Sequence, residues 1–301
     1  MNCAVIGLGR MGSAIVYRLL KAGHAVVGYD PSAQARQEAA TVGATIVSTL
    51  EECAHHAQIM WLMVPAGPIV DQVLRELLPH LNAGAVVIDG GNSKFSDSIR
   101  RFQELKSVGI EFLDCGTSGG LHGKEIGFSL MIGGDIQAFQ KVEPIFTAIA
   151  APQGYGLVGP SGCGHYVKMV HNGIEYALLQ SYAEGLQLLN EGEFKDLDLA
   201  KITNIWQHGS IIRSWILELT HEILKKDQKL EKISGTIAES GTGSWTVEEA
   251  HKQKVPVKLI EDALEIRAWS RESGGNYATK LVALMRNAFG GHALGMKNPP
   301  K

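Results

Sequence analysis

The chain has 301 residues, of which 45% are apolar and 20% are charged, and its formal net charge is −3. This composition is typical of a soluble globular protein of one or two domains. The charge argues against broad nucleic-acid binding, which needs a basic stripe. No apolar run approaches the ~20 residues of a membrane span, and no basic, apolar leader is visible, so we expect neither a membrane anchor nor a signal peptide. The four cysteines, Cys3, Cys53, Cys115 and Cys163, lack metal-ligand spacing and predict reduced thiols in a cytoplasmic protein.

The first half of the chain alternates short apolar runs with segments of helical periodicity. This alternation is typical of βαβ units and a parallel sheet. It predicts a Rossmann-type, doubly wound α/β domain over residues 1–160, with the boundary in the glycine-rich segment 155–165. The predicted strands are 3–6, 25–29, 59–64, 85–88 and 128–132, and the predicted helices are 13–22, 32–42, 69–78 and 136–149.

The second half of the chain is almost wholly helical in pattern. It predicts an all-α C-terminal domain over residues 161–301. Four tryptophans, Trp61, Trp206, Trp215 and Trp269, are interpreted as core residues. The predicted helices are 164–190, 199–207, 212–224, 245–251, 259–273 and 277–289.

A glycine-rich segment, Gly7-Leu8-Gly9-Arg10-Met11-Gly12, follows the first predicted strand and opens a helix. In this context Gly7 allows a tight turn, Gly9 lets the backbone approach a pyrophosphate, and Gly12 lets helix and strand pack closely. Asp30 ends the second predicted strand, close to the spacing expected for an acid on the adenosine ribose. A carboxylate there favours NAD over NADP. The alternative is a tight turn in a protein without a nucleotide, with Asp30 as a helix cap.

A polar stripe lies within the otherwise apolar segment 164–176. On a helix, Lys168, His171, Asn172 and Glu175 stand at i, i+3, i+4 and i+7 and share one face. A buried helix face has little reason to hold four polar groups unless they meet each other or a ligand. A salt-bridged surface face is the alternative interpretation. The neighbouring motifs favour a polar substrate.

Three further clusters follow predicted strands, at the edge where open α/β sheets bind ligands. They are Met63-Val64-Pro65-Ala66-Gly67, Asp89-Gly90-Gly91-Asn92-Ser93 and Asp114-Cys115-Gly116-Thr117-Ser118-Gly119-Gly120. Together with the stripe they closely resemble the β-hydroxyacid dehydrogenase superfamily. Within it, segments 164–176, 240–246 and 286–292 resemble the catalytic helix, phosphate loop and substrate-binding tail of the decarboxylating 6-phosphogluconate dehydrogenase family. The chain resembles a short form of that family, because the familiar long form is roughly half as long again.

The resemblance implies NAD-dependent oxidative decarboxylation of 6-phosphogluconate to ribulose 5-phosphate and CO₂, with no metal. Lys168 would take the C3 hydroxyl proton and Glu175 would protonate C1 of the enediol. The tail would reach a neighbouring subunit's site, which implies a homodimer or homotetramer. Substrate hydroxyls would be held by Asn92, His171 and Asn172, the C1 carboxylate by Ser118, Gly119 and Gly120, and the phosphate by Tyr176, Thr242, Arg267, Arg286 and His292. The dinucleotide would meet Gly7, Leu8, Gly9, Arg10, Met11, Gly12, Asp30, Met63, Val64, Pro65 and Asn92.

Each assignment has a structural alternative. Lys168 would snorkel to water, Asn92 would only cap the next helix, and the two arginines would be surface cations. At the start of the phosphate loop, Ser240 stands where the long form usually has lysine, which removes one charge-assisted contact. Two other functions remain open: a non-decarboxylating dehydrogenase of the 3-hydroxyisobutyrate type, and a non-catalytic dinucleotide sensor.

Overall fold

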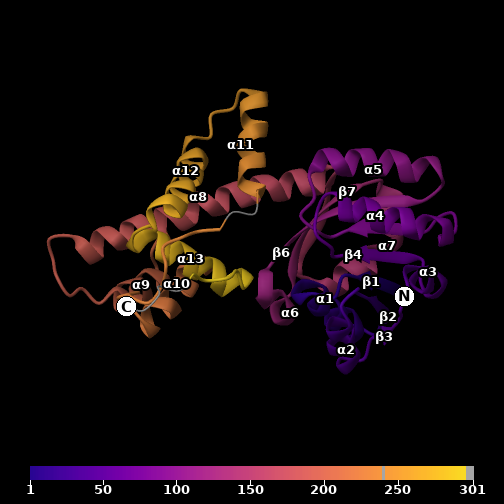
Figure 1. The fold of residues 1–301 in the computed structure, drawn as a ribbon, viewed down its shortest axis with the longest axis horizontal. Coiled ribbons are helices and arrows are strands. Elements are labelled where there is room, and N and C mark those ends of the chain that lie inside the picture. The colour runs from indigo at the N-terminus through magenta and orange to yellow at the C-terminus, as the bar shows by residue number, and fades with distance from the viewer. Residues whose placement is uncertain (239–240, 296–301) are drawn as a thin grey trace. The chain divides into compact units, whose positions relative to one another are not determined.

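A computed structural model describes residues 1–238 and 241–295. The chain divides into two compact units, the first ending at Met169 and the second beginning at Val170. The long helix α8 (Cys163–Glu191) starts in the first unit and ends in the second (Figure 1).

The first unit is built on one eight-stranded sheet with the order β3-β2-β1-β4-β5-β6-β7-β8. The order reverses beside β1, as in the doubly wound dinucleotide-binding fold, and confirms the predicted fold class. Pairing is parallel from β3 through β6. The strands are β1 (Asn2–Ile6), β2 (Ala25–Tyr29), β3 (Thr45–Ile46), β4 (Ile59–Leu62), β5 (Val86–Asp89), β6 (Glu111–Ser118), β7 (Phe128–Gly134) and β8 (Ala150–Gly159).

Successive residues of a strand point to opposite faces of the sheet. Both faces therefore carry apolar side chains, and helices cover both. One core contains Val5, Trp61 and Ile88 under α1 (Arg10–Lys21) and α7 (Ile136–Ile149). The other contains Met60 and Val87 under three more helices. Those helices are α3 (Leu50–His56), α4 (Pro68–Leu77) and α5 (Phe95–Ser107), while α2 (Ala33–Thr41) follows β2.

The structure departs from the sequence-based expectation at β7, which pairs with β6 in the antiparallel sense. The connection between them holds only a short 3₁₀ turn, η2 (Gly120–His122), and one-turn α6 (Gly123–Ile126). A parallel partner needs a crossover of a dozen or more residues, so this connection enforces antiparallel pairing. The predicted strand 59–64 is also shorter, ending at Leu62.

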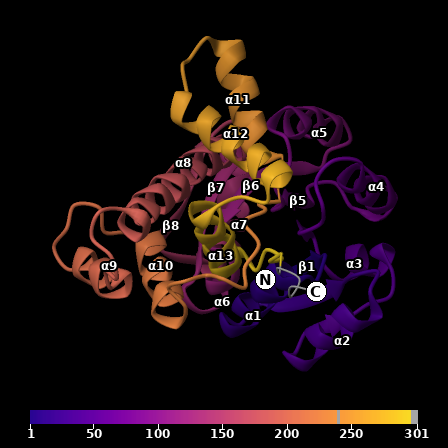
Figure 2. The same ribbon diagram turned by 60° about the vertical axis from the view of Figure 1, so that its left-hand side comes forward.

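The second unit is all-helical, as predicted (Figure 2). Its core gathers Leu179, Leu186, Leu224 and Leu281. Two of the predicted tryptophans are not core, since Trp215 and Trp269 are 39% and 45% exposed. Its helices after α8 are α9 (Leu199–Gln207), α10 (Trp215–Lys226), α11 (Thr242–Gln253), α12 (Lys258–Ser273) and α13 (Tyr277–Gly290). The first unit also contains a short 3₁₀ helix, η1 (Leu78–His80).

Within residues 1–238 and 241–295, no helix is long and apolar enough to cross a membrane. Within the same ranges, no three His, Cys, Asp or Glu side chains are grouped so as to hold a metal ion.

Candidate active site

The glycines of the turn between β1 and α1 each occupy a position that the local backbone geometry explains. Gly7 has φ +95°, a conformation that L side chains rarely adopt, and a Cβ on Gly12 would overlap the Gly7 carbonyl. A Cβ on Gly9 would meet nothing within 4 Å, so this position opens to space. Gly9 caps α1 without a side chain, and the first turn has no acidic residue. The N–H groups and dipole of α1 thus face a site suited to an anion.

The other side chains of this turn lie differently. Leu8 is buried in the sheet core, where its N–H donates to Asp30 and its carbonyl accepts from Ser13 Oγ, whereas Arg10 is exposed. Met11 is partly buried against the same core.

Asp30 ties the end of β2 to the glycine turn. One carboxylate oxygen accepts from Leu8 N at 2.8 Å, and the other accepts from Ser32 N at 2.8 Å. Ser32 is the N-cap of α2, so Asp30 is not the cap itself. Arg36 donates to the backbone carbonyl of Asp30 at 2.6 Å.

The turns after β4 and β5 lie side by side. A Cβ on Gly91 would come 3.0 Å from the Val64 carbonyl oxygen. Met63 and Val64 are partly buried, and Pro65 is exposed. Asn92 is exposed, and the N-cap of α5 is Lys94, so Asn92 does not cap that helix.

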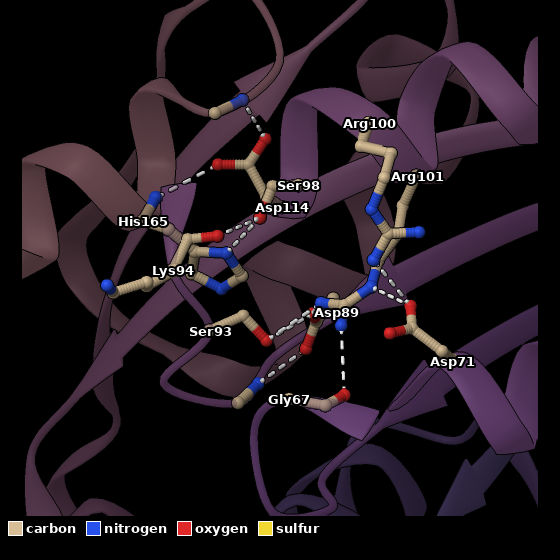
Figure 3. Close-up of polar contacts among 12 residues, drawn as sticks. Gly67, Asp71, Asp89, Ser93, Lys94, Ser98, Arg100, Arg101, Asp114 and His165 are labelled. Carbon is tan, nitrogen blue, oxygen red and sulfur yellow. Dashed lines mark hydrogen bonds and ion pairs between the residues drawn. The ribbon is translucent and has the colours of Figure 1, made fainter. Parts of the chain in front are cut away.

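Beneath these turns lies a buried ion pair that the sequence did not predict, between Asp89 of the Asp89–Ser93 cluster and Arg101. Asp89 accepts from Gly91 N at 3.2 Å and from Ser93 Oγ at 2.7 Å, and it pairs with Arg101 of α5 (Figure 3). Asp89 and Arg101 are both 0% exposed. The only signal in the sequence was an arginine on the apolar side of an amphipathic helix, which is a weak signal because such arginines usually face solvent.

Ser118 ends β6, and the two glycines after it form a sharp turn. Gly119 and Gly120 have φ values of +131° and +53°, which explains the glycine pair physically. All three residues are partly exposed. Their backbone is therefore accessible to a ligand at the edge of the sheet.

Lys168 is buried against β6 within the first unit. It is 7% exposed, which excludes the snorkelling alternative, and a Cβ on Gly116 would overlap the Lys168 side chain. The start of α8 is held by Asp114, which accepts from Gly162 N at 2.6 Å and His165 N at 2.9 Å (Figure 3). A buried carboxylate at a helix N-terminus is electrostatically favourable. Asp114 thereby fixes the helix turns that carry Lys168.

The remaining members of the stripe continue along α8 in the second unit. Asn172 is buried, and His171 and Glu175 are partly buried. His171 Nδ1 lies 3.2 Å from Asn172 Oδ1. The helix is continuous from Cys163 to Glu191, so the predicted common face is confirmed for its backbone.

Part of the predicted phosphate set converges in the second unit. Arg267 of α12 is fully buried, with its Cζ 3.2 Å from the centroid of the Tyr176 ring. The same ring packs on Gly243, beside Thr242 at the start of α11. Arg286 of α13 is 5% exposed. Both arginines are therefore buried, which contradicts the alternative interpretation that they are surface cations.

His292 is the remaining position of the predicted phosphate set. His292 lies past α13, where its carbonyl accepts from Asn287 Nδ2 at 2.8 Å and its ring meets Phe289 edge-on. Ser240, expected at the start of the phosphate loop, lies outside the described residues.

Comparisons with known proteins give a consistent result. Residues 2–167 match the NAD binding domain of 6-phosphogluconate dehydrogenase, and residues 164–288 match the C-terminal domain of the same enzyme. The chain is 46% identical to an NAD(+)-dependent, decarboxylating 6-phosphogluconate dehydrogenase of Haloferax volcanii, covering 99% of this chain and 100% of that relative. It is 42% identical to the putative 6-phosphogluconate dehydrogenase YqeC of Bacillus subtilis, covering 97% and 99%.

A solved structure of Plasmodium falciparum 6-phosphogluconate dehydrogenase superimposes with a TM-score of 0.82 at 30% identity. The match covers 91% of this chain and 62% of that one. The two full-length matches and this partial match agree with the predicted short form.

Proposed function

Because the chain belongs to the 6-phosphogluconate dehydrogenase family, we propose that it oxidises and decarboxylates 6-phosphogluconate with NAD, giving ribulose 5-phosphate, CO₂ and NADH. The observation that carries this proposal is α8, which bears a buried Lys168 and, two turns later, Glu175. A plain hydroxyacid dehydrogenase needs an amine but no second acid.

The first unit holds the dinucleotide in this proposal. Gly9 and the uncapped start of α1 would hold its pyrophosphate, and Asp30 would accept from the adenosine ribose hydroxyls. The turns at Met63–Pro65 and Asn92 would hold the nicotinamide end. The bound dinucleotide supplies a hydride acceptor for the hydrogen on C3.

Lys168 acts on the C3 hydroxyl. It takes the hydroxyl proton as the C–H bond breaks, so that C3 becomes a ketone. It then returns the proton to the C3 oxygen as the C1–C2 bond breaks and CO₂ departs, because the ketone accepts that electron pair. A positioned acid or base contributes about 10²- to 10⁴-fold to such steps.

Glu175 completes the reaction by protonating C1 of the resulting enediol, which gives the ketone product. Asn92, His171 and Asn172 hold the substrate hydroxyls during these steps. The turn formed by Ser118, Gly119 and Gly120 takes the carboxylate that will leave. Tyr176, Thr242, Arg267, Arg286 and His292 take the phosphate.

We further propose that the second unit forms a homo-oligomer whose tail lies near a neighbouring subunit's site. In support, this unit exposes large apolar side chains, among them Ile174 at 53%, Leu178 at 44% and Ile211 at 100%. Exposed apolar surface of this kind is typical of subunit interfaces.

The free cysteines Cys3, Cys53, Cys115 and Cys163 support a reducing compartment such as the cytoplasm.

Initial-rate assays with 6-phosphogluconate and gluconate, each with NAD and NADP, test the function while CO₂ is trapped. We expect CO₂ and NADH in equal amounts, with 6-phosphogluconate and NAD as the preferred pair. NADH formation without CO₂ contradicts the decarboxylation. A preference for gluconate contradicts the role of the phosphate set.

A further inference from the structure

A single buried guanidinium connects the two turns that carry the predicted nicotinamide contacts. Arg101 Nη2 donates to the Gly67 carbonyl at 3.0 Å, at the end of the turn that follows β4. Its Nη1 lies 3.3 Å from both Asp89 Oδ2 and Ser93 Oγ, in the turn that follows β5. Its Nε donates to Asp71 Oδ1 at 2.8 Å. Figure 3 shows these contacts around one side chain.

The turn after β5 is fixed on both sides of Asn92. Gly91 N and Ser93 Oγ both donate to Asp89, which itself pairs with Arg101. Asn92 lies between these two anchored neighbours and is exposed. The network therefore holds the backbone of Asn92 in place while its side chain faces outward.

Only arginine matches this arrangement. Its planar fork sends three nitrogens to acceptors on three segments, whereas lysine offers one nitrogen. Burying a cation at 0% exposure is unfavourable in free energy. An apolar residue would fill the same space without this desolvation penalty, so packing alone does not explain an arginine here. The chain instead places here a buried charge whose three nitrogens are all hydrogen-bonded, at the base of the two turns.

We propose that Arg101 is a positioning residue for the dehydrogenase reaction: it sets the place of Asn92 relative to the Met63–Gly67 turn, and thereby the approach of substrate C3 to the nicotinamide. This inference rests on the proposed function. A displacement of about 1 Å at reacting groups costs on the order of 10²-fold in rate. Loss of the fork therefore lowers kcat while leaving ligand binding largely intact.

The test compares Arg101→Lys with Arg100→Lys, its neighbour on α5. Arg100 also donates to Asp71 Oδ1, at 2.9 Å, and pairs with Glu104, but its side chain is 44% exposed and neither of these partners belongs to the two turns. Both variants keep their charge. The measurements are kcat and KM per folded molecule, with folding followed by circular dichroism, and the NADH dissociation constant by fluorescence.

We expect Arg101→Lys to lower kcat roughly 10- to 100-fold, with KM and NADH affinity changed by less than about threefold. Arg100→Lys keeps kcat within about twofold, as expected for a surface ion pair. An Arg101→Lys protein with wild-type kcat, or one in which affinity and kcat fall together, overturns the proposal. If the wild-type protein shows no turnover, the proposed function fails. If the wild type is active and Arg101→Lys is equally active, only the positioning role of Arg101 fails.

Ser93→Ala keeps the inference testable if Arg101→Lys does not fold. It removes the hydroxyl that bridges Asp89 and Arg101 and leaves the guanidinium with Asp71, Gly67 and its direct contact to Asp89. We expect kcat to fall several-fold at unchanged NADH affinity. An unchanged kcat in Ser93→Ala overturns the proposal.

Discussion

The guanidinium carbon of Arg267 lies 3.2 Å from the centroid of the Tyr176 ring, which joins α12 to the helix that carries the predicted catalytic stripe. Stacking on an aromatic face fixes the plane of an arginine fork. In our proposal this fork receives the 6-phosphate of the substrate.

Replacing Arg267 by lysine will raise KM for 6-phosphogluconate. A charge-assisted hydrogen bond is worth about 1.5–3 kcal/mol, so loss of one arm of the fork predicts a roughly 10- to 100-fold increase. Because gluconate has no phosphate, its kcat/KM will be the same in variant and wild type. Arg271→Lys is the matched control, since Arg271 lies one turn further along α12 and is exposed. An equal loss with both substrates would contradict a phosphate contact.

Glu175→Gln will lower kcat about 10²- to 10⁴-fold because the amide cannot protonate C1 of the enediol. NADH affinity will change little, since Glu175 is not assigned to the dinucleotide. Glu184→Gln, further along α8 and exposed, is expected to keep full activity. Steady-state kinetics and fluorescence titration measure both quantities, and a fully active Glu175→Gln protein would end the assignment.

Asp30→Asn will shift the preference from NAD towards NADP. The amide keeps an acceptor for Leu8 N or Ser32 N but removes the negative charge that repels a 2′-phosphate. We expect the ratio of kcat/KM values for NAD and NADP to fall at least tenfold, equivalent to about 1.4 kcal/mol. Ser32→Ala, which alters the cap of α2 without changing charge, is the control. An unchanged ratio would show that the ribose lies elsewhere.

Asp71 will make stability depend on pH in acid. Burial raises the pKa of Asp71, but hydrogen bonds from Arg101 and Arg100 outweigh it, so the net pKa lies below its ordinary value. A lowered folded pKa contributes stability above the unfolded value of about 3.9, and this stability is lost as pH falls through the folded pKa.

Asp71→Asn therefore lowers the free energy of unfolding by about 1–3 kcal/mol at neutral pH, and the gap to wild type narrows below about pH 4. Urea denaturation at several pH values measures this. Glu104→Gln, which removes an exposed partner of Arg100, should cost less than about 1 kcal/mol. A gap that stays constant with pH would mean that the Asp71 charge is not responsible.

Paired charges on the exposed face of α8 will dissociate the proposed oligomer. Ile174 and Leu178 are one helical turn apart and both exposed, so Ile174→Asp with Leu178→Asp places two carboxylates on one patch. We expect a smaller mass by light scattering at the same protein concentration. Val108→Asp, at an exposed apolar position of the first unit, leaves the mass unchanged. A double variant of wild-type mass would place the interface elsewhere.

Local spacing determined much of what the sequence revealed. The strand–glycine turn–helix order from Gly7 to Gly12 and the helical face shared by Lys168 and Glu175 depend on residues close in the chain, where steric rules and helix periodicity act directly. The prediction of α7 at 136–149 and α9 at 199–207 matched the observed bounds for the same reason.

Tertiary structure decided which of those faces are covered and by what. Trp215 and Trp269 read as core residues from their type but are exposed, and Arg267 and Arg101 carry charge but are fully buried. The direction of β7 followed from the length of the segment before it. Burial and pairing depend on partners distant in sequence: Arg101 meets Gly67 and Asp89 only because neighbouring parallel strands end at the same edge of the sheet.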